Sequence, residues 1–203
     1  MLSSKNGSVP KAGAGFVTSK GPEGSTYMRR ISAFLVLLLA FPVYAQEKKP
    51  VTLKSILLTQ LRSTHNQKEW FVPISVALDG VTVEQAKWTD GKGNHSIGQL
   101  AYHLWFWNTQ TLAKLKGEKP PAFGGNNEET FDHYDAKTWG ETVQELDKVL
   151  TDMETAIEGM DDAKLAPLAN TIAHVGTHNA YHIAQIVVLR RQQGSWDPEK
   201  GVK

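Results

Sequence analysis

The sequence predicts an all-α protein built around a bundle of four helices. Apolar residues recur at helical spacing in four segments, and residues typical of helix ends punctuate these segments. No stretch keeps the strict alternation of apolar and polar residues that a half-buried strand requires. Four segments of roughly 20–27 residues with mostly short links favour a bundle. The 203 residues suffice for one domain with a substantial core.

The first predicted helix runs from Thr52 to about Leu78. Its apolar residues form one stripe with a break in register near Asn66. Pro73 is expected to kink the helix, because proline removes a backbone hydrogen bond. The Asp-Gly pair that follows Leu78 is expected to end it.

Two Ser/Thr-x-x-Gln motifs are typical of helix starts, because each can satisfy two backbone amides. Thr82 with Gln85 predicts one short extra turn in the connection after the first helix. Ser96 with Gln99 predicts the start of the second long helix, which Gly117 is expected to end.

The last two long helices have similar start signals. Thr138 with Glu141 is expected to cap the third helix. The fourth is expected to begin near Pro167 or Asn170 and to run to about Gln193, just before a glycine.

The link from Gly117 to Lys137 is the exception to the short connections. Links of this length without structure are uncommon in compact domains and are often functional. It contains aromatic residues, paired glycines and His133. We therefore predict a lid or a wall of a site, with a surface loop around its own aromatic cluster as the alternative.

Residues 28–45 have the pattern of a signal peptide. Two arginines precede an apolar run at residues 31–41, and a Val-Tyr-Ala sequence at residues 43–45 resembles a cleavage site. The apolar run is shorter than the roughly 18–20 residues that a membrane-spanning helix needs. We expect an exported, periplasmic or extracellular protein whose only membrane contact is this segment. The arginine pair also leaves the twin-arginine route open.

Residues 1–27 are polar, rich in glycine and serine, and lack apolar periodicity. They are expected to be disordered, or to precede a true translation start at Met28. Residues 46–203 are expected to form the bundle domain.

The charge and the lack of cysteine exclude several functions. The formal net charge is +1, but five basic residues and only one acidic residue lie within residues 1–45, so the rest of the chain is mildly acidic. This balance argues against a nucleic-acid partner. Without cysteine the chain has no disulfide, thiolate ligand, thiol nucleophile or lipoprotein anchor.

Three histidines of the fourth predicted helix point to a metal site. His174, His178 and His182 are spaced four apart and share one face. Adjacent members lie about 5–6 Å apart at Cβ, whereas the outer two are about 12 Å apart along the axis. One ion can therefore take either His174 with His178 or His178 with His182.

His103 of the second predicted helix is the candidate third ligand. It stands among aromatic residues, where a desolvated imidazole needs a polar partner. Three imidazoles with vacant positions suit catalytic zinc, nickel or ferrous iron. Of the others, His65 is expected to be exposed and His95 to be a loop residue, while His133 could reach the site.

Two motifs resemble the DinB-like superfamily of metal-binding four-helix bundle proteins. Residues 96–100, Ser-Ile-Gly-Gln-Leu, followed by His103, resemble the second helix of that family. Residues 178–186 resemble its last helix, in which an H-x-x-x-H pair is followed closely by a glutamine. Residues 189–194 also match the end of that helix. The resemblance covers about residues 51–203.

The resemblance implies a ligand set and an architecture. The implied ligands are His103, His178 and His182, with His174 packing beside the site. The implied fold is a four-helix bundle, often dimeric, in which residues 117–137 would form a long crossover connection. One residue departs from the family pattern.

The departure is Ala184, which stands where a glycine is common. It is expected to tighten helix packing without affecting the metal.

The implied activities are those of a metal-dependent hydrolase or transferase acting on an unknown small molecule. Some relatives are thiol-dependent transferases or isomerases and others are hydrolases, and export favours hydrolysis. Trp107 and Tyr181 are expected to line a pocket, and Gln185 and Asn108 to orient a ligand or substrate. The sequence identifies no catalytic acid or base. The alternatives are non-enzymatic metal binding and a helical interaction domain without metal.

Overall fold

A computed structural model describes residues 50–202, and within them the secondary structure is entirely helical, with no strand. The all-α prediction is therefore confirmed. The longest helices are α1 (Leu53–His65), α4 (Ile97–Lys116), α6 (Trp139–Glu158) and α8 (Ala169–Gln192). The shorter ones are α2 (Ile74–Leu78), α3 (Val83–Lys87), α5 (Glu129–Asp132) and α7 (Asp162–Leu165), with 3-10 turns η1 (Ala136–Thr138), η2 (Ala166–Leu168) and η3 (Pro198–Lys200). The predicted signal segment lies outside the described residues.

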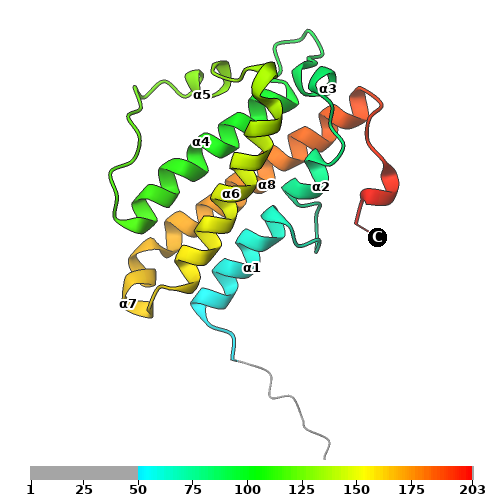
Figure 1. Ribbon diagram of the computed structural model, residues 1–203. Helices are drawn as coiled ribbons and strands as arrows, with labels where there is room; N and C mark the ends of the chain where they lie inside the picture. The colour runs from blue at the N-terminus through cyan, green and yellow to red at the C-terminus, as the bar shows by residue number, and fades with distance from the viewer. Residues whose placement is uncertain (1–49, 203) are drawn as a thin grey trace, which may run out of the picture. The chain divides into compact units, whose positions relative to one another are not determined.

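Each of the long helices packs against two others. Helix α1 contacts α6 and α8, and α4 contacts the same two helices. Figure 1 shows that α1 and α8 run in one direction, whereas α4 and α6 run in the opposite one. This arrangement requires the chain to return along the length of α4 before α6 begins, which the link containing α5 does (Figure 1). None of the helices in residues 50–202 is both long and apolar enough to span a membrane.

The core fills the space between these helices with aliphatic side chains. Its fully buried members include Leu61 of α1, Leu104 of α4, Leu150 of α6 and Ile186 of α8. Burying each such side chain stabilises the fold by about 1.5–3 kcal/mol. The apolar stripes read from the sequence therefore face one another.

The first predicted helix is wrong in its length. Helix α1 ends at His65, with Asn66 as its C-cap, and α2 begins only after Pro73. Proline disfavours helical backbone in the residue before it and is tolerated at a helix start. Pro73 therefore starts a new short helix instead of kinking a long one. Trp70, in the segment between them, is 93% exposed.

Both predicted Ser/Thr-x-x-Gln capping boxes are confirmed. The amide of Gln85 donates to Thr82 Oγ1 at 3.3 Å, and the amide of Thr82 donates to Gln85 Oε1 at 2.9 Å. The reciprocal bonds of Ser96 and Gln99 measure 2.9 and 3.2 Å and start α4. Gly117 ends α4 with a positive φ of 72°, a conformation that glycine adopts without strain.

The predicted cap of the third helix is wrong in its chemistry, although α6 begins where expected. The Thr138 hydroxyl donates to the carbonyl of Asp135 at 2.9 Å and caps nothing. Instead, the Asp135 carboxylate accepts from the amide of Lys137 at 2.9 Å and starts η1, which leads directly into α6.

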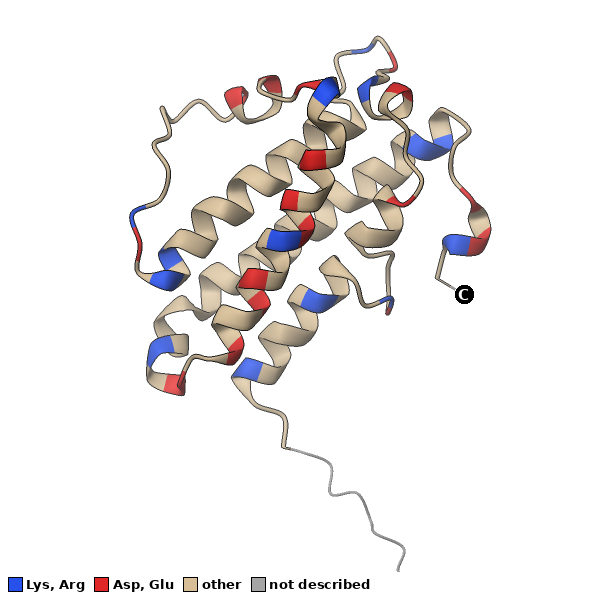
Figure 2. Cartoon of the chain, viewed as in Figure 1, with Lys and Arg blue, Asp and Glu red and all other residues tan. Residues whose placement is uncertain are grey.

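His65 is buried, which corrects the prediction that it is exposed. Only 1% of its surface is accessible. Its Nδ1 lies 2.6 Å from Glu154 Oε1 and its Nε2 lies 3.0 Å from Asp147 Oδ1, both on α6. Arg62 adds bonds to Glu154 and Glu158. Figure 2 shows basic residues of α1 beside acidic residues of α6. A polar seam thus joins α1 to α6, and a helix pattern does not reveal it.

Arg190 of α8 holds two peripheral segments against the bundle. It is 3% exposed, and its Nη1 donates to the carbonyls of Ala77 and Asp79 at 2.8 and 3.1 Å. Its Nη2 donates to the carbonyl of Ser195 at 2.9 Å. Burial lowers the pKa of Arg190. The side chain therefore fixes the end of α2 and the chain after α8.

Replacing Arg190 by methionine should lower the free energy of unfolding by about 2–4 kcal/mol, because buried carbonyls lose charge-assisted bonds. Arg191→Met is the control, since Arg191 is the exposed neighbour and its loss should change stability by less than about 0.5 kcal/mol. Urea denaturation followed by circular dichroism measures both. Equal stabilities of the two variants would contradict this role.

Candidate metal centre

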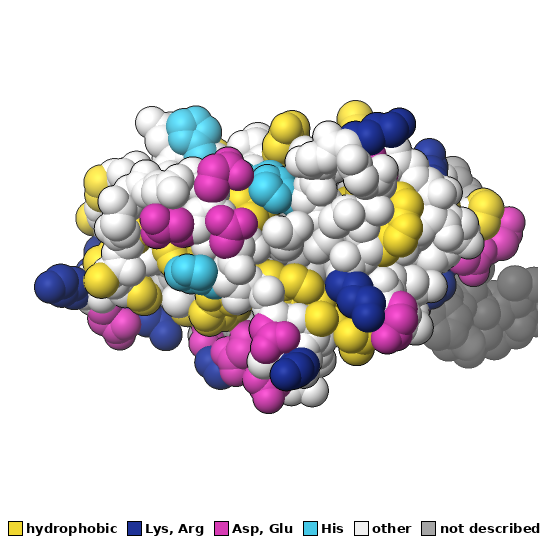
Figure 3. Space-filling model, turned by 90° about the horizontal axis from the view of Figure 1, so that it is seen from above, with side chains coloured by type: hydrophobic (Ala, Val, Ile, Leu, Met, Phe, Trp, Pro, Cys, Tyr) yellow, Lys and Arg dark blue, Asp and Glu magenta, His cyan; other side chains and the backbone are white. Residues whose placement is uncertain are grey.

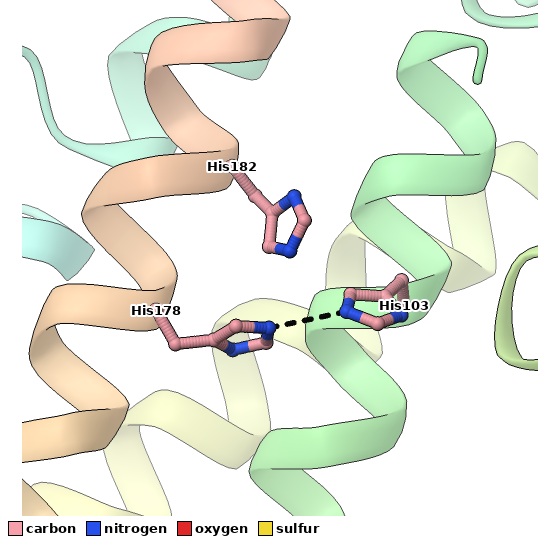
Figure 4. Close-up of side chains that lie close together, drawn as sticks. All are labelled: His103, His178 and His182. Carbon is pink, nitrogen blue, oxygen red and sulfur yellow. Dashed lines mark hydrogen bonds between the residues drawn. The ribbon is translucent and has the colours of Figure 1, made fainter. Parts of the chain in front are cut away.

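Three histidines from two helices meet in the interior. Helix α4 carries His103, and α8 carries His178 and His182 one turn apart; Figure 4 shows their rings converging between the helices. One ring nitrogen from each lies within 4.8 Å of the others. His103 is 2% exposed, His182 is 7% exposed and His178 is half-buried. The spacing argument left two pairs open, and the geometry groups His178 with His182.

The distances suit a shared ion. The Nε2 atoms of His103 and His178 lie 3.1 Å apart (Figure 4). Two imidazoles bound to one zinc ion at about 2.0–2.1 Å place their nitrogens about 3–3.4 Å apart. Among the described residues, the cluster contains no carboxylate, so its donors are neutral imidazoles. Such a set fits zinc, nickel or ferrous iron.

Thr130 of α5 is the hydrogen-bond partner of His103. The Thr130 hydroxyl donates to the carbonyl of Asn127 at 2.6 Å. Its oxygen lies 2.6 Å from His103 Nδ1, where it can accept a hydrogen bond from that nitrogen. Nε2 of His103 then keeps its lone pair and faces the other two histidines.

Gln185 supports His182 in a similar way. The Gln185 Oε1 atom lies 2.6 Å from His182 Nδ1 and accepts a hydrogen bond from it. The Nε2 of His182 therefore also keeps a lone pair. Gln185, expected to orient a ligand or substrate, thus orients a histidine.

A stack of three parallel rings fixes the plane of His103. The Phe131 ring of α5 lies 3.9 Å from the His103 ring at an interplanar angle of 6°. On the other face of Phe131, the His95 ring lies 3.8 Å away at 3°. His95 is a loop residue, as predicted, and it contributes to the site through this contact.

Burial keeps the three imidazoles neutral. Desolvation, reinforced by the neighbouring histidines, lowers the pKa of His103 to about 3. The same causes lower the pKa of His178 to about 4. Burial also lowers the pKa of His182, although its bond to Gln185 opposes the shift. All three therefore offer lone pairs at neutral pH, which is the form that binds metal ions.

Two other candidates pair elsewhere. Asn108 bonds to the amide of Asn179 at 2.9 and 3.3 Å and to the carbonyl of Leu104 at 2.7 Å. It therefore joins α4 to α8. The Trp107 indole donates to Asn127 Oδ1 at 3.3 Å, and its ring lies 6.4 Å from His103, edge-on. Trp107 thus forms part of the wall beside the site.

Several side chains lie apart from the cluster. His174 and His133 are exposed, so His174 does not pack beside the site and His133 does not reach it. Ala184 is also exposed, so it does not tighten helix packing. Tyr181 is largely exposed, and its ring lies 4.9 Å from that of His182.

A hollow of about 550 Å³ borders the site. Its lining includes His95, Leu100, Tyr181, Gln185 and Val188. The three clustered histidines are not in its lining. A small molecule bound there would therefore touch the groups that support the site.

The surface around α5 is acidic. Glu128, Glu129 and Asp132 are exposed there together with His133. Figure 3 shows histidine and acidic side chains gathered on this end of the molecule. Negative charge near the site raises the local concentration of cations.

Sequence reasoning missed Thr130, and it included Phe131 only as one aromatic residue of the predicted lid or site wall. They lie in the long link, and only their proximity to His103 in space shows their role. The prediction of a site wall came nearer to the structure than that of a separate surface loop.

A family model described as the DinB superfamily matches residues 74–186, more than half of the chain. The matched range contains all three histidines and Thr130. No curated protein and no solved structure gives a significant match.

The lowered pKa values predict a weak pH dependence of metal affinity. Protons compete appreciably for the lone pairs of His103 and His178 only as the pH approaches the pKa of His178, about 4. The dissociation constant for zinc should therefore change less than about threefold between pH 7 and pH 5.5. Calorimetric titration in a non-chelating buffer measures it. Histidines with an ordinary pKa near 6.5 would weaken binding by about tenfold or more over this range, and that result would contradict the prediction.

Proposed function

The chain belongs to the DinB superfamily, and from this premise we propose that it binds one divalent transition metal ion through His103, His178 and His182. The main support for this proposal is that one ring nitrogen from each of the three histidines lies within 4.8 Å of the others, with two of the residues buried and His178 half-buried. We propose zinc, nickel or ferrous iron as the ion, because imidazole donors suit these metals.

We propose that the protein is a metal-dependent hydrolase or transferase acting on a small molecule. When bound, such an ion supplies a Lewis acid that lowers the pKa of a coordinated water or thiol. Thr130 and Gln185 lie at hydrogen-bond distance from Nδ1 of His103 and of His182 and so orient two of the imidazoles. The hollow beside Tyr181 offers space for a substrate.

The alternative is a non-enzymatic metal-binding protein. It predicts a coordination sphere filled by protein groups and a long link that stays away from the ion. The cluster has three protein donors, fewer than the four of closed structural sites. The link reaches His103 through Thr130 and Phe131. Both observations support the enzyme.

The arrangement of the helices supports a DinB-type four-helix bundle with a crossover connection. Helices α4 and α6 run in the same direction (Figure 1), and residues 117–137 return between them. A homodimer remains part of the proposal through the family resemblance.

We also propose that the protein is exported, on the support of the signal-like pattern at residues 28–45. Export favours hydrolysis over thiol transfer, because low-molecular-weight thiols are mainly cytosolic.

Replacing His178 by alanine should abolish metal binding, because one donor of three is lost. The purified wild-type protein, loaded with zinc and desalted, should retain about one ion per chain. His174→Ala is the matched control, since it lies one turn earlier on α8 and is exposed. Elemental analysis measures all three proteins. If wild type and His178→Ala hold equal metal, the proposed site is wrong.

The same preparation separates the enzyme from its alternative. With cobalt in place of zinc, an added ligand such as azide should change the visible absorption spectrum if coordination positions are free. An absorption spectrum that azide leaves unchanged would favour a site whose coordination positions are filled, as the non-enzymatic alternative expects.

When the full-length chain is expressed, the processed protein should be recovered from the cell envelope or medium with Gln46 as its first residue. Leu38→Arg should block export, because it places a charge in the apolar run. Leu2→Arg, in residues 1–27, should not. Cell fractionation and intact mass measure the outcome, and an uncleaved cytosolic wild-type protein would refute export.

A further inference from the structure

Helix α5 contacts His103 through two adjacent, buried side chains, Thr130 and Phe131. We propose that Thr130 is a positioning residue that sets the tautomer of His103 and thereby presents Nε2 for metal binding. The part of this inference that concerns metal affinity rests on the proposed function. The part that concerns the tautomer does not.

The proton of the Thr130 hydroxyl has only one place to lie. The carbonyl oxygen of Asn127 is 2.6 Å away and can only accept. Without a proton between them, two oxygen lone pairs would repel at this distance. The hydroxyl proton therefore points to Asn127.

This assignment determines the proton on His103. With its own proton directed to Asn127, Thr130 Oγ1 presents a lone pair to His103 Nδ1 at 2.6 Å. Nδ1 must then carry the proton, and a neutral imidazole carries only one. Nε2 of His103 is therefore bare, and it faces His178 Nε2 at 3.1 Å (Figure 4).

Phe131 supplies a second constraint that acts on a different degree of freedom. Its ring lies parallel to His103 at 3.9 Å and is itself covered by His95 on the other face. This stack fixes the plane of the imidazole, because tilting the ring would break its face-to-face contact with Phe131. The hydrogen bond places the proton on Nδ1, and the stack fixes the plane in which the lone pair of Nε2 lies.

A purely structural role for Thr130 makes a different prediction. Threonine hydroxyls often bond to a nearby preceding carbonyl, and Thr142 of α6 is such a case, with its Oγ1 donating to Thr138 at 3.1 Å. Thr142 is also buried. Loss of a bond of this kind changes stability and leaves a distant tautomer unaffected. Thr142→Val is therefore the matched control for Thr130→Val.

The first measurement uses the metal-free protein at neutral pH. Long-range proton–nitrogen NMR of ¹⁵N-histidine-labelled protein, with His103→Asn to assign the signals, reports which ring nitrogen carries the proton. Wild type, Thr130→Ser and Thr142→Val should show His103 protonated at Nδ1. Thr130→Val should show a mixture or the Nε2 form.

The second measurement is zinc affinity. Thr130→Val should raise the dissociation constant by about 10–100-fold, the usual effect of losing a group that orients a metal ligand. Thr130→Ser should restore it, because serine keeps the hydroxyl. Circular dichroism verifies that the variants fold.

The outcomes separate this inference from the proposed function. If the wild-type His103 is protonated at Nε2, the inference is overturned whether or not any variant folds. It is also overturned if a folded Thr130→Val keeps the Nδ1 form and the wild-type zinc affinity. If the tautomer responds as expected but wild type binds no zinc, the tautomer assignment stands and the proposed metal site fails.

Discussion

The structure depends on placing three uncharged imidazoles in the seam between α4 and α8. Burial lowers their pKa values, so they remain neutral and keep their lone pairs. A buried ring nitrogen that lacks a partner destabilises the fold by about 1–3 kcal/mol. The chain must therefore provide a hydrogen-bond acceptor for each outward N–H and leave the inward nitrogens free. Thr130 and Gln185 meet this requirement for His103 and His182.

This requirement gives the long link a structural reason. The acceptor for His182 lies three residues further along the same helix, so α8 supplies it locally. The acceptor for His103 Nδ1 comes from neither α6 nor α8. The returning link supplies it through Thr130 of α5. The parallel course of α4 and α6 makes such a return necessary (Figure 1). The same segment thus returns the chain to the start of α6 and provides the hydrogen-bond partner of His103.

The sequence predicts the parts of the site that repeat along a helix and fails where a partner comes from elsewhere. The four-residue spacing of His178 and His182, and the capped start of α4 that places His103, are local patterns that the structure confirms. The prediction that His65 is exposed fails because its partners, Asp147 and Glu154, lie on a helix far along the chain. Thr130 was missed for the same reason. Pro73 is a different failure, in which the restriction on the preceding residue outweighs an apolar stripe.

His178 differs from the other two histidines in a way that bears on how an ion could enter. Within the described residues its Nδ1 has no hydrogen-bond partner, and its ring is half-buried. Its Nε2 lies 3.1 Å from that of His103 and faces the same point between the helices, but no side chain of the described residues holds its proton on Nδ1 as Thr130 does for His103. Binding of an ion at His178 Nε2 requires the tautomer with the proton on Nδ1. Thr130 and Gln185 hold two of the imidazoles, while His178 lies nearer the surface without such a partner. This arrangement would let an ion enter past His178 while the bundle stays closed.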